Sequence, residues 1–148
     1  LLGDFGVRIQ GGSVLLSPLP ETLSIGDITG QGLPFYSGSV IYETEDIEEL
    51  HGAEVEVTAE AFGGSLVKLL GEGEEVIAFP PYRARIRNLR GIEVVLTRRN
   101  TFGPLHQFPR EAISYGPGNL MTEGEEWSRE YMLYPQGLLE NPVIIQGL

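Results

Sequence analysis

The chain has 148 residues, a length that fits one domain able to bury about 68–70% of its unfolded surface without disulfide or metal support. Its net charge of −11 disfavours contact with phosphate backbones and anionic lipid, so neither nucleic acid nor a membrane is an expected partner. The lack of cysteine excludes a disulfide framework, a thiol nucleophile and a zinc–thiolate site, and no apolar run approaches the ~20 residues that span a bilayer.

Period-two alternation of apolar and polar residues predicts short strands along the chain. It is clearest in residues 54–60, where acidic residues and threonine alternate with valine and alanine, and in residues 82–87, where Arg83, Arg85 and Arg87 share one face. Further strands are expected at residues 5–10, 13–17, 38–44, 65–70, 74–79, 92–97, 131–134 and 143–146. Hairpin turns are expected at Gly11-Gly12 and Gly71-Glu72-Gly73, and a single helical turn at residues 46–50.

Many short strands without βαβ alternation predict an all-β fold, and half-buried strands favour a jelly-roll-like antiparallel β-sandwich. We expect one domain over residues 1–148. The chain begins Leu-Leu-Gly-Asp without an initiator methionine, so we expect it to be a C-terminal fragment of a larger protein. Pro80-Pro81 must end one strand and turn into the next, with a cis bond compatible with that turn.

Three stretches carry a family resemblance. They are Gly-Leu-Pro-Phe-Tyr-Ser-Gly-Ser-Val-Ile-Tyr at 32–42, Phe-Gly-Gly-Ser-Leu-Val-Lys-Leu-Leu-Gly at 62–71 with Phe-Pro-Pro-Tyr-Arg at 79–83, and Leu-Thr-Arg-Arg-Asn-Thr-Phe-Gly-Pro-Leu-His at 96–106. Their order resembles the galactose-binding-like jelly roll of glycoside hydrolase family 2 and related large bacterial hydrolases. Residues 131–139 are similar to the terminal strand of such domains. Leu70 departs from the pattern, since an asparagine usually precedes that glycine.

The resemblance implies a non-catalytic accessory domain of a glycoside-hydrolase-like protein. The catalytic carboxylates of those enzymes lie on a separate barrel domain, and no stretch of this chain looks like such a barrel domain. The implied role is carbohydrate binding or packing against that catalytic barrel, so the expected partners are other domains of the same polypeptide and a glycan. The alternative is a structural or oligomerisation sandwich without a ligand, whose acidic face (residues 43–60) and basic face (residues 83–99) dock onto other domains or a second copy.

The candidate carbohydrate-contacting residues each have a structural alternative. The arginines that share one face with Arg83 could bind sugar hydroxyls or a carboxylate. In the alternative, this arginine stripe pairs across strands with Glu54, Glu56 and Glu60. Tyr82 and Trp127, the only tryptophan, could stack on sugar rings, or else pack over the edge of a sandwich.

A polar cluster follows the last long predicted strand. Arg98, Asn100 and His106 could line a pocket where loops gather at one end of a sandwich. In the alternative, Asn100 caps a turn, Gly103-Pro104 reverses the chain, and His106 is an ordinary loop residue.

No cofactor is expected. His51 and His106 are far apart in sequence, which is a poor metal pattern and disfavours a small cupin-type enzyme. No stretch matches a calcium-binding loop, so a structural calcium ion is compatible with the sequence but not indicated by it.

Overall fold

The computed structural model describes residues 3–44, 47–109 and 115–147. Its chain folds as an all-β protein built from antiparallel sheets, which confirms the predicted β-sandwich class. By its contacts the chain divides into two compact units. The sandwich unit comprises Ile25–Asp27, Gly38–Thr97 and Gln136–Leu148, and the hairpin unit comprises Leu1–Ser24, Ile28–Ser37 and Arg98–Pro135. The single domain expected from the chain length stays a prediction.

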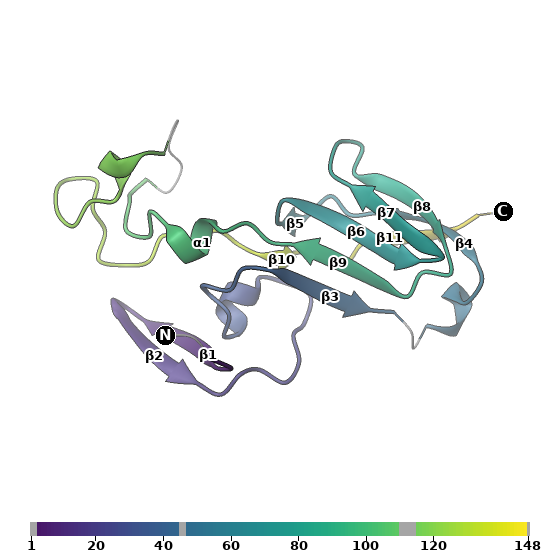
Figure 1. Cartoon of the computed structure of the whole chain (residues 1–148), viewed down its shortest axis with the longest axis horizontal. Coiled ribbons are helices and arrows are strands. Elements are labelled where there is room, and N and C mark those ends of the chain that lie inside the picture. The colour runs from purple at the N-terminus through teal and green to yellow at the C-terminus, as the bar shows by residue number, and fades with distance from the viewer. Residues whose placement is uncertain (1–2, 45–46, 110–114, 148) are drawn as a thin grey trace. The chain divides into compact units, whose positions relative to one another are not determined.

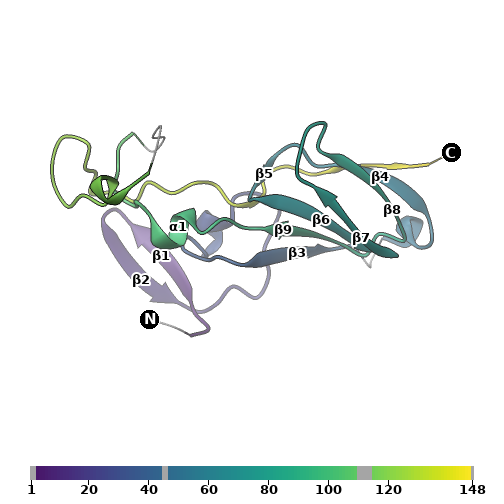
Figure 2. The same cartoon turned by 45° about the horizontal axis from the view of Figure 1, so that its top comes forward.

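The sandwich unit contains two larger sheets, which Figures 1 and 2 show in teal to blue with one yellow strand. The first has the strand order β3 (Ser39–Glu43), β9 (Gly91–Val95), β6 (Leu66–Gly71) and β7 (Gly73–Ile77). The second has the order β11 (Val143–Gln146), β4 (Glu54–Thr58) and β8 (Arg83–Arg87). The short strands β5 (Phe62–Gly63) and β10 (Gly137–Leu138) pair with each other, and a 3₁₀ turn, η2, spans Glu48–Leu50.

The core of the sandwich unit follows from the alternation in its strands. In β4, Val55 and Val57 are fully buried, while in β8 the side chain of Ile86 is buried between exposed arginines. The four-stranded sheet contributes the buried side chains of Val67, Leu69, Ile77, Ile92 and Val94. Because successive side chains of a strand point to opposite faces, each sheet has one apolar face, and burial of these two faces stabilises the unit.

The hairpin unit is held by a two-stranded sheet and short helical turns (Figure 1). Strand β1 (Gly6–Gln10) pairs with β2 (Ser13–Ser17) across the predicted Gly11-Gly12 turn. Gly11 has a φ of 58°, which a glycine adopts without the clash that a Cβ would cause. The remaining elements are the 3₁₀ turns η1 (Ile28–Gln31) and η3 (Pro117–Asn119) and the four-residue helix α1 (Arg99–Phe102).

Most predicted strands are confirmed, but the strand expected at residues 131–134 is wrong, since that segment carries no regular structure. Its physical reason lies at Tyr134, whose backbone N–H and C=O are both bonded by the side chain of Asn100 instead of a neighbouring strand. The helical turn expected at 46–50 is present over Glu48–Leu50, and position 46 lies outside the described residues. The Pro80–Pro81 bond is cis.

Candidate functional site

The six predicted contact residues fall in two different units. Tyr82 and Arg83 belong to the sandwich unit, whereas Arg98, Asn100, His106 and Trp127 belong to the hairpin unit. Within the hairpin unit, His106 and Trp127 are brought into ring contact.

Tyr82 and Arg83 are engaged in contacts within the sandwich unit. The Tyr82 ring meets Phe62 edge to face at 5.9 Å, and Tyr82, which immediately precedes β8, has a φ of 49°. The Arg83 Nη1 atom lies 3.6 Å from Glu56 Oε1, and Arg85 Nε lies 3.0 Å from Glu56 Oε2. These ion pairs match the cross-strand alternative for the arginine stripe at Glu56, whereas Arg87 reaches Glu72 at 4.0 Å.

Asn100 is fully buried and does not line an open surface. Its amide nitrogen donates to the carbonyl of Tyr134 at 2.7 Å, and its Oδ1 accepts from the Tyr134 N–H at 2.9 Å. The side chain therefore substitutes for a neighbouring strand and fixes α1 to the segment at Tyr134. Its partner lies 34 positions away in sequence, so neither the turn-capping role nor the pocket-lining role describes it.

The two adjacent arginines of the polar cluster have different environments. Arg98 precedes α1 and is exposed. Arg99 is half-buried, with its guanidinium 4.9 Å from the centre of the Tyr115 ring and 5.2 Å from that of Tyr134. Its Nη1 donates to the carbonyl of Pro104. No local pattern predicts this arrangement, since the two tyrosines are distant from Arg99 in sequence and belong to no periodic pattern.

The side chains of His106, Trp127 and Tyr131 form one aromatic surface in the hairpin unit, which we call the aromatic platform. The imidazole of His106 stacks on the Trp127 indole with ring centres 5.9 Å apart and planes inclined by 28°. The imidazole also meets the Tyr131 ring, with ring centres 4.6 Å apart, and Tyr131 meets Phe35 edge to face at 5.2 Å. The sequence gives no sign of the contact between Tyr131 and His106, which appears only in the structure.

Backbone hydrogen bonds place the platform residues side by side. The segment that carries His106 runs antiparallel to the segment that carries Trp127, with an isolated bridge between Gln107 and Trp127. The N–H of Ser128 donates to the carbonyl of His106 at 2.7 Å, and the N–H of Phe108 donates to the carbonyl of Glu126 at 2.7 Å. The rings therefore rest on a paired backbone.

The hydrogen bond of His106 fixes the tautomer of its ring. Its Nδ1 lies 2.9 Å from the carbonyl oxygen of Ser128, and a carbonyl oxygen can only accept a hydrogen bond. Nδ1 therefore carries the proton, and in the neutral ring Nε2 is an acceptor. No residue among 3–44, 47–109 and 115–147 bonds this Nε2 or the indole N–H of Trp127.

The aromatic platform thus offers an apolar face beside two polar atoms. Trp127 is 36% exposed although its ring is partly covered by His106. An exposed aromatic ring gives C–H groups a surface on which to stack, while the imidazole acceptor and the indole donor suit hydroxyl groups.

The chain was compared with known proteins, and no family model, curated protein or solved structure matches it. Within the described part of the chain, no three side chains of histidine, aspartate or glutamate gather as a group that could hold a metal ion. Among the helices of the same residues, none combines the length and the apolar character needed to cross a membrane.

Proposed function

We propose that this chain is a non-catalytic accessory module that binds carbohydrate on the aromatic platform. The observation that carries the proposal is the stacked His106–Trp127 pair, whose indole is exposed and whose imidazole holds an acceptor nitrogen beside it. Sugar rings present C–H groups on their faces and hydroxyl groups at their edges, and both features have a counterpart here.

The construction of the platform supports binding with little rearrangement. The ring of His106 is held by its contacts with Trp127 and Tyr131 and by its bond to Ser128, so few side-chain rotations remain to be lost when a ligand binds. Pre-organisation of this kind strengthens binding, because each rotamer-rich side chain that is immobilised costs about 0.5–1.5 kcal/mol.

The resemblance to the galactose-binding-like jelly roll of glycoside hydrolase family 2 supports the same role. It rests on the stretches at 32–42, 62–71, 79–83 and 96–106, and the last of these includes His106. On this proposal the module belongs to a glycoside-hydrolase-like protein and presents a glycan to a catalytic barrel of the same polypeptide.

Fluorescence of Trp127 gives a direct test, because it is the only tryptophan of the chain and all indole emission comes from the platform. D-Galactose, D-glucose and their oligosaccharides are titrated against the intact chain. We expect a saturable change in emission with at least one neutral sugar. A flat response to every sugar from a folded chain contradicts the proposal.

Variants of the platform are compared by calorimetry, since Trp127→Ala removes the fluorophore. Trp127→Ala is expected to weaken binding at least about tenfold, which corresponds to about 1.4 kcal/mol. His106→Phe keeps a ring but removes the acceptor, so we expect a smaller loss. Phe79→Ala removes an aromatic side chain that is 82% exposed in the sandwich unit, and it should leave binding unchanged.

A second candidate function is a docking module without a sugar ligand. It is favoured by β2, where the apolar side chains of Val14, Leu15 and Leu16 are between 40% and 59% exposed. Exposed apolar side chains that are neighbours on a strand are typical of surfaces buried against another protein. Self-association on sedimentation, abolished in Leu16→Asp, together with a flat sugar titration would support this candidate.

A further inference from the structure

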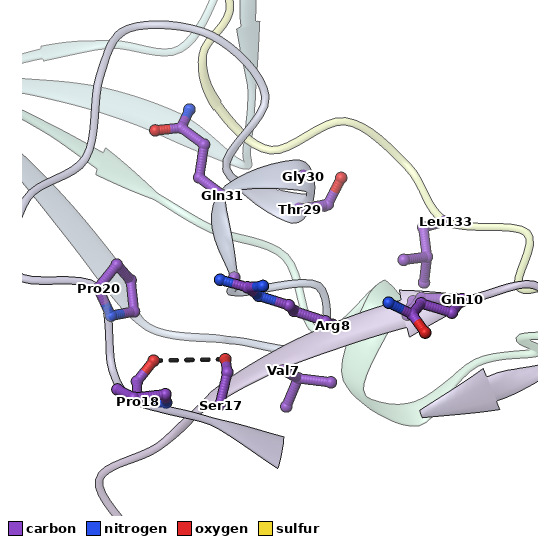
Figure 3. Close-up of a pocket in the computed structure, with 12 residues that line it drawn as sticks. Val7, Arg8, Gln10, Ser17, Pro18, Pro20, Thr29, Gly30, Gln31 and Leu133 are labelled. Atoms are coloured by element: carbon purple, nitrogen blue, oxygen red, sulfur yellow. Dashed lines mark hydrogen bonds between the residues drawn. The ribbon is translucent and has the colours of Figure 1, made fainter. Parts of the chain in front are cut away.

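The hairpin unit contains a pocket that shares no residue with the aromatic platform. It has a volume of about 680 Å³ and lies among β1, the segment 17–20, η1 and Leu133 (Figure 3). A volume in this range is typical of sites that hold small molecules, whose pockets measure about 300–1,000 Å³.

The walls of this pocket are fixed by hydrogen bonds within the unit. The N–H of Val7, on β1, donates to the carbonyl of Gly32 at 2.8 Å. The side-chain amide of Gln31 accepts from the N–H of Ser24 at 2.8 Å and donates to the carbonyl of Ser24 at 3.1 Å. These bonds tie the strand and η1 to their neighbours.

Strand β1 also packs closely against Ser17 and Pro18, which line the pocket. A Cβ added at Gly6 would lie 2.5 Å from the carbonyl oxygen of Pro18 and 2.7 Å from Ser17 Oγ. Only glycine allows β1 to approach the end of β2 this closely. The pocket is therefore formed before any ligand arrives.

The charge inside the pocket has one sign. Among the described residues, Arg8 is the only charged one that lines the pocket, and Figure 3 places this side chain in the middle of the others. Within the part of the chain that the structure describes, no aspartate or glutamate lines the pocket and Arg8 forms no ion pair. This contrasts with the chain as a whole, where 21 acidic residues outnumber 10 basic ones.

The remaining lining complements a cation with neutral hydrogen-bonding groups. Gln10, Ser17 and Thr29 contribute an amide and two hydroxyls, while Val7 and Leu133 contribute apolar surface. A guanidinium donates two parallel hydrogen bonds to the two oxygens of a carboxylate or phosphate, whereas a neutral hydroxyl group accepts only one such bond.

We propose that this pocket binds a small polar ligand through an oxyanion held by Arg8. The oxyanion could be supplied by the carboxylate of a sugar acid or by the phosphate of a sugar phosphate, and both present the same pair of acceptor oxygens to the guanidinium. The inference does not rest on the carbohydrate function of the platform, because the two sets of lining residues are separate.

The test uses amide chemical shifts of the isotopically labelled chain in an anion-poor buffer. D-Glucuronate, D-glucose 6-phosphate and neutral D-glucose are added in parallel. We expect the amides of Gly30 and Gly32, which line the pocket, to move with at least one of the two anions and not with D-glucose. The anion that binds more tightly identifies the source of the oxyanion.

Charge variants decide whether Arg8 is responsible. Arg8→Gln is expected to weaken anion binding at least about tenfold, and Arg8→Lys, which keeps the charge without the fork, to weaken it less. Arg87→Gln removes the same charge from an exposed site in the sandwich unit and should change nothing. Binding should also weaken when salt is raised, because added ions screen an exposed charge.

Two results would overturn the inference. One is the absence of pocket shifts with both anions, and the other is binding that Arg8→Gln leaves intact or that D-glucose matches. Trp127→Ala should leave anion binding unchanged, and Arg8→Gln should leave neutral-sugar binding at the platform unchanged. Failure of one proposal is therefore separable from failure of the other.

Discussion

The phenol oxygen of Tyr42, on β3, accepts a hydrogen bond of 3.0 Å from the backbone N–H of Leu138, on β10. Leu138 is almost fully buried, so its N–H has no access to water. Burial raises the pKa of Tyr42 above its ordinary value of 10.0, and the bond from Leu138 partly opposes this rise. One side chain thus anchors β10 and also links the stability of the sandwich unit to pH.

Replacement of Tyr42 by phenylalanine is expected to destabilise the chain by about 1–3 kcal/mol, because the buried N–H of Leu138 then lacks an acceptor. Unfolding in urea at neutral pH measures this loss. Leu66→Val, a conservative change on a half-buried side chain of β6, serves as a control with a smaller effect. A phenylalanine variant as stable as the original chain would show that the bond contributes nothing.

The raised pKa of Tyr42 predicts a loss of stability at alkaline pH. The native state keeps this proton where the unfolded chain releases it, so the contribution of Tyr42 is complete below pH 10.0 and is lost as pH rises through the folded-state pKa. Unfolding free energies are measured between about pH 8 and pH 11. The other five tyrosines are present in both the original chain and Tyr42→Phe, so the free energy of unfolding should decline less steeply with pH in the variant. Parallel curves for the two chains would contradict the prediction.

Asn100→Asp is expected to be strongly destabilising although it changes only one atom type. The substitution removes the amide N–H that donates to the carbonyl of Tyr134. A carboxylate oxygen then faces that carbonyl oxygen at a fully buried position. The expected loss is about 3–5 kcal/mol, as for a buried charge without a partner. Asn141→Asp, at an exposed position, should change stability by less than about 0.5 kcal/mol. Equal effects of the two substitutions would show that the hydrogen bonds between Asn100 and Tyr134 do not stabilise the fold.

The ion pair between Glu56 and Arg85 should contribute little although its atoms lie 3.0 Å apart. The arginine side chain is 72% exposed, so water and salt screen the pair. A double-mutant cycle of Glu56→Gln and Arg85→Gln is expected to give a coupling of about 0.2–1 kcal/mol that shrinks in high salt. A coupling above about 2 kcal/mol, or one insensitive to salt, is the contrary result.

Gly71→Ala is expected to destabilise the chain by about 1–3 kcal/mol through overpacking. A Cβ at Gly71, on β6, would lie 2.5 Å from the carbonyl oxygen of Arg87 and 2.8 Å from that of Asn88. Both atoms are backbone, so relief requires the end of β8 to move. Gly118→Ala meets nothing within 4 Å and is the matched control. Thermal unfolding of the two variants should separate them, and similar midpoints would contradict the expected clash.

The strands could be predicted from sequence where one face is buried and the other is wet. In β4 and β8 the alternation that assigned Val55, Val57 and Ile86 to one face also matches their burial. The strand predicted at residues 131–134 was wrong, because a short apolar and aromatic run looks the same in sequence whether a neighbouring strand or a single side chain bonds its backbone. The choice was made by Asn100, which no local pattern connects to Tyr134.

The aromatic platform was only partly predictable. Trp127 and His106 stood out as an isolated tryptophan and a histidine in a polar stretch, but nothing in sequence placed their rings 5.9 Å apart. The position of Arg8 in a pocket was not predictable, because the sequence around an arginine in a strand does not show whether a carboxylate will lie beside it.

The sequence by itself determined the all-β class, the turns at Gly11-Gly12 and Gly71-Glu72-Gly73, and the wet faces of the strands. These features depend on neighbouring residues, since turn chemistry and side-chain alternation are local properties of the chain. Only the tertiary structure decided that His106 meets Trp127, that Asn100 bonds Tyr134, and that no acidic residue among those described lines the pocket of Arg8. Those contacts join distant segments, and their partners are selected by packing of the whole unit rather than by any local pattern.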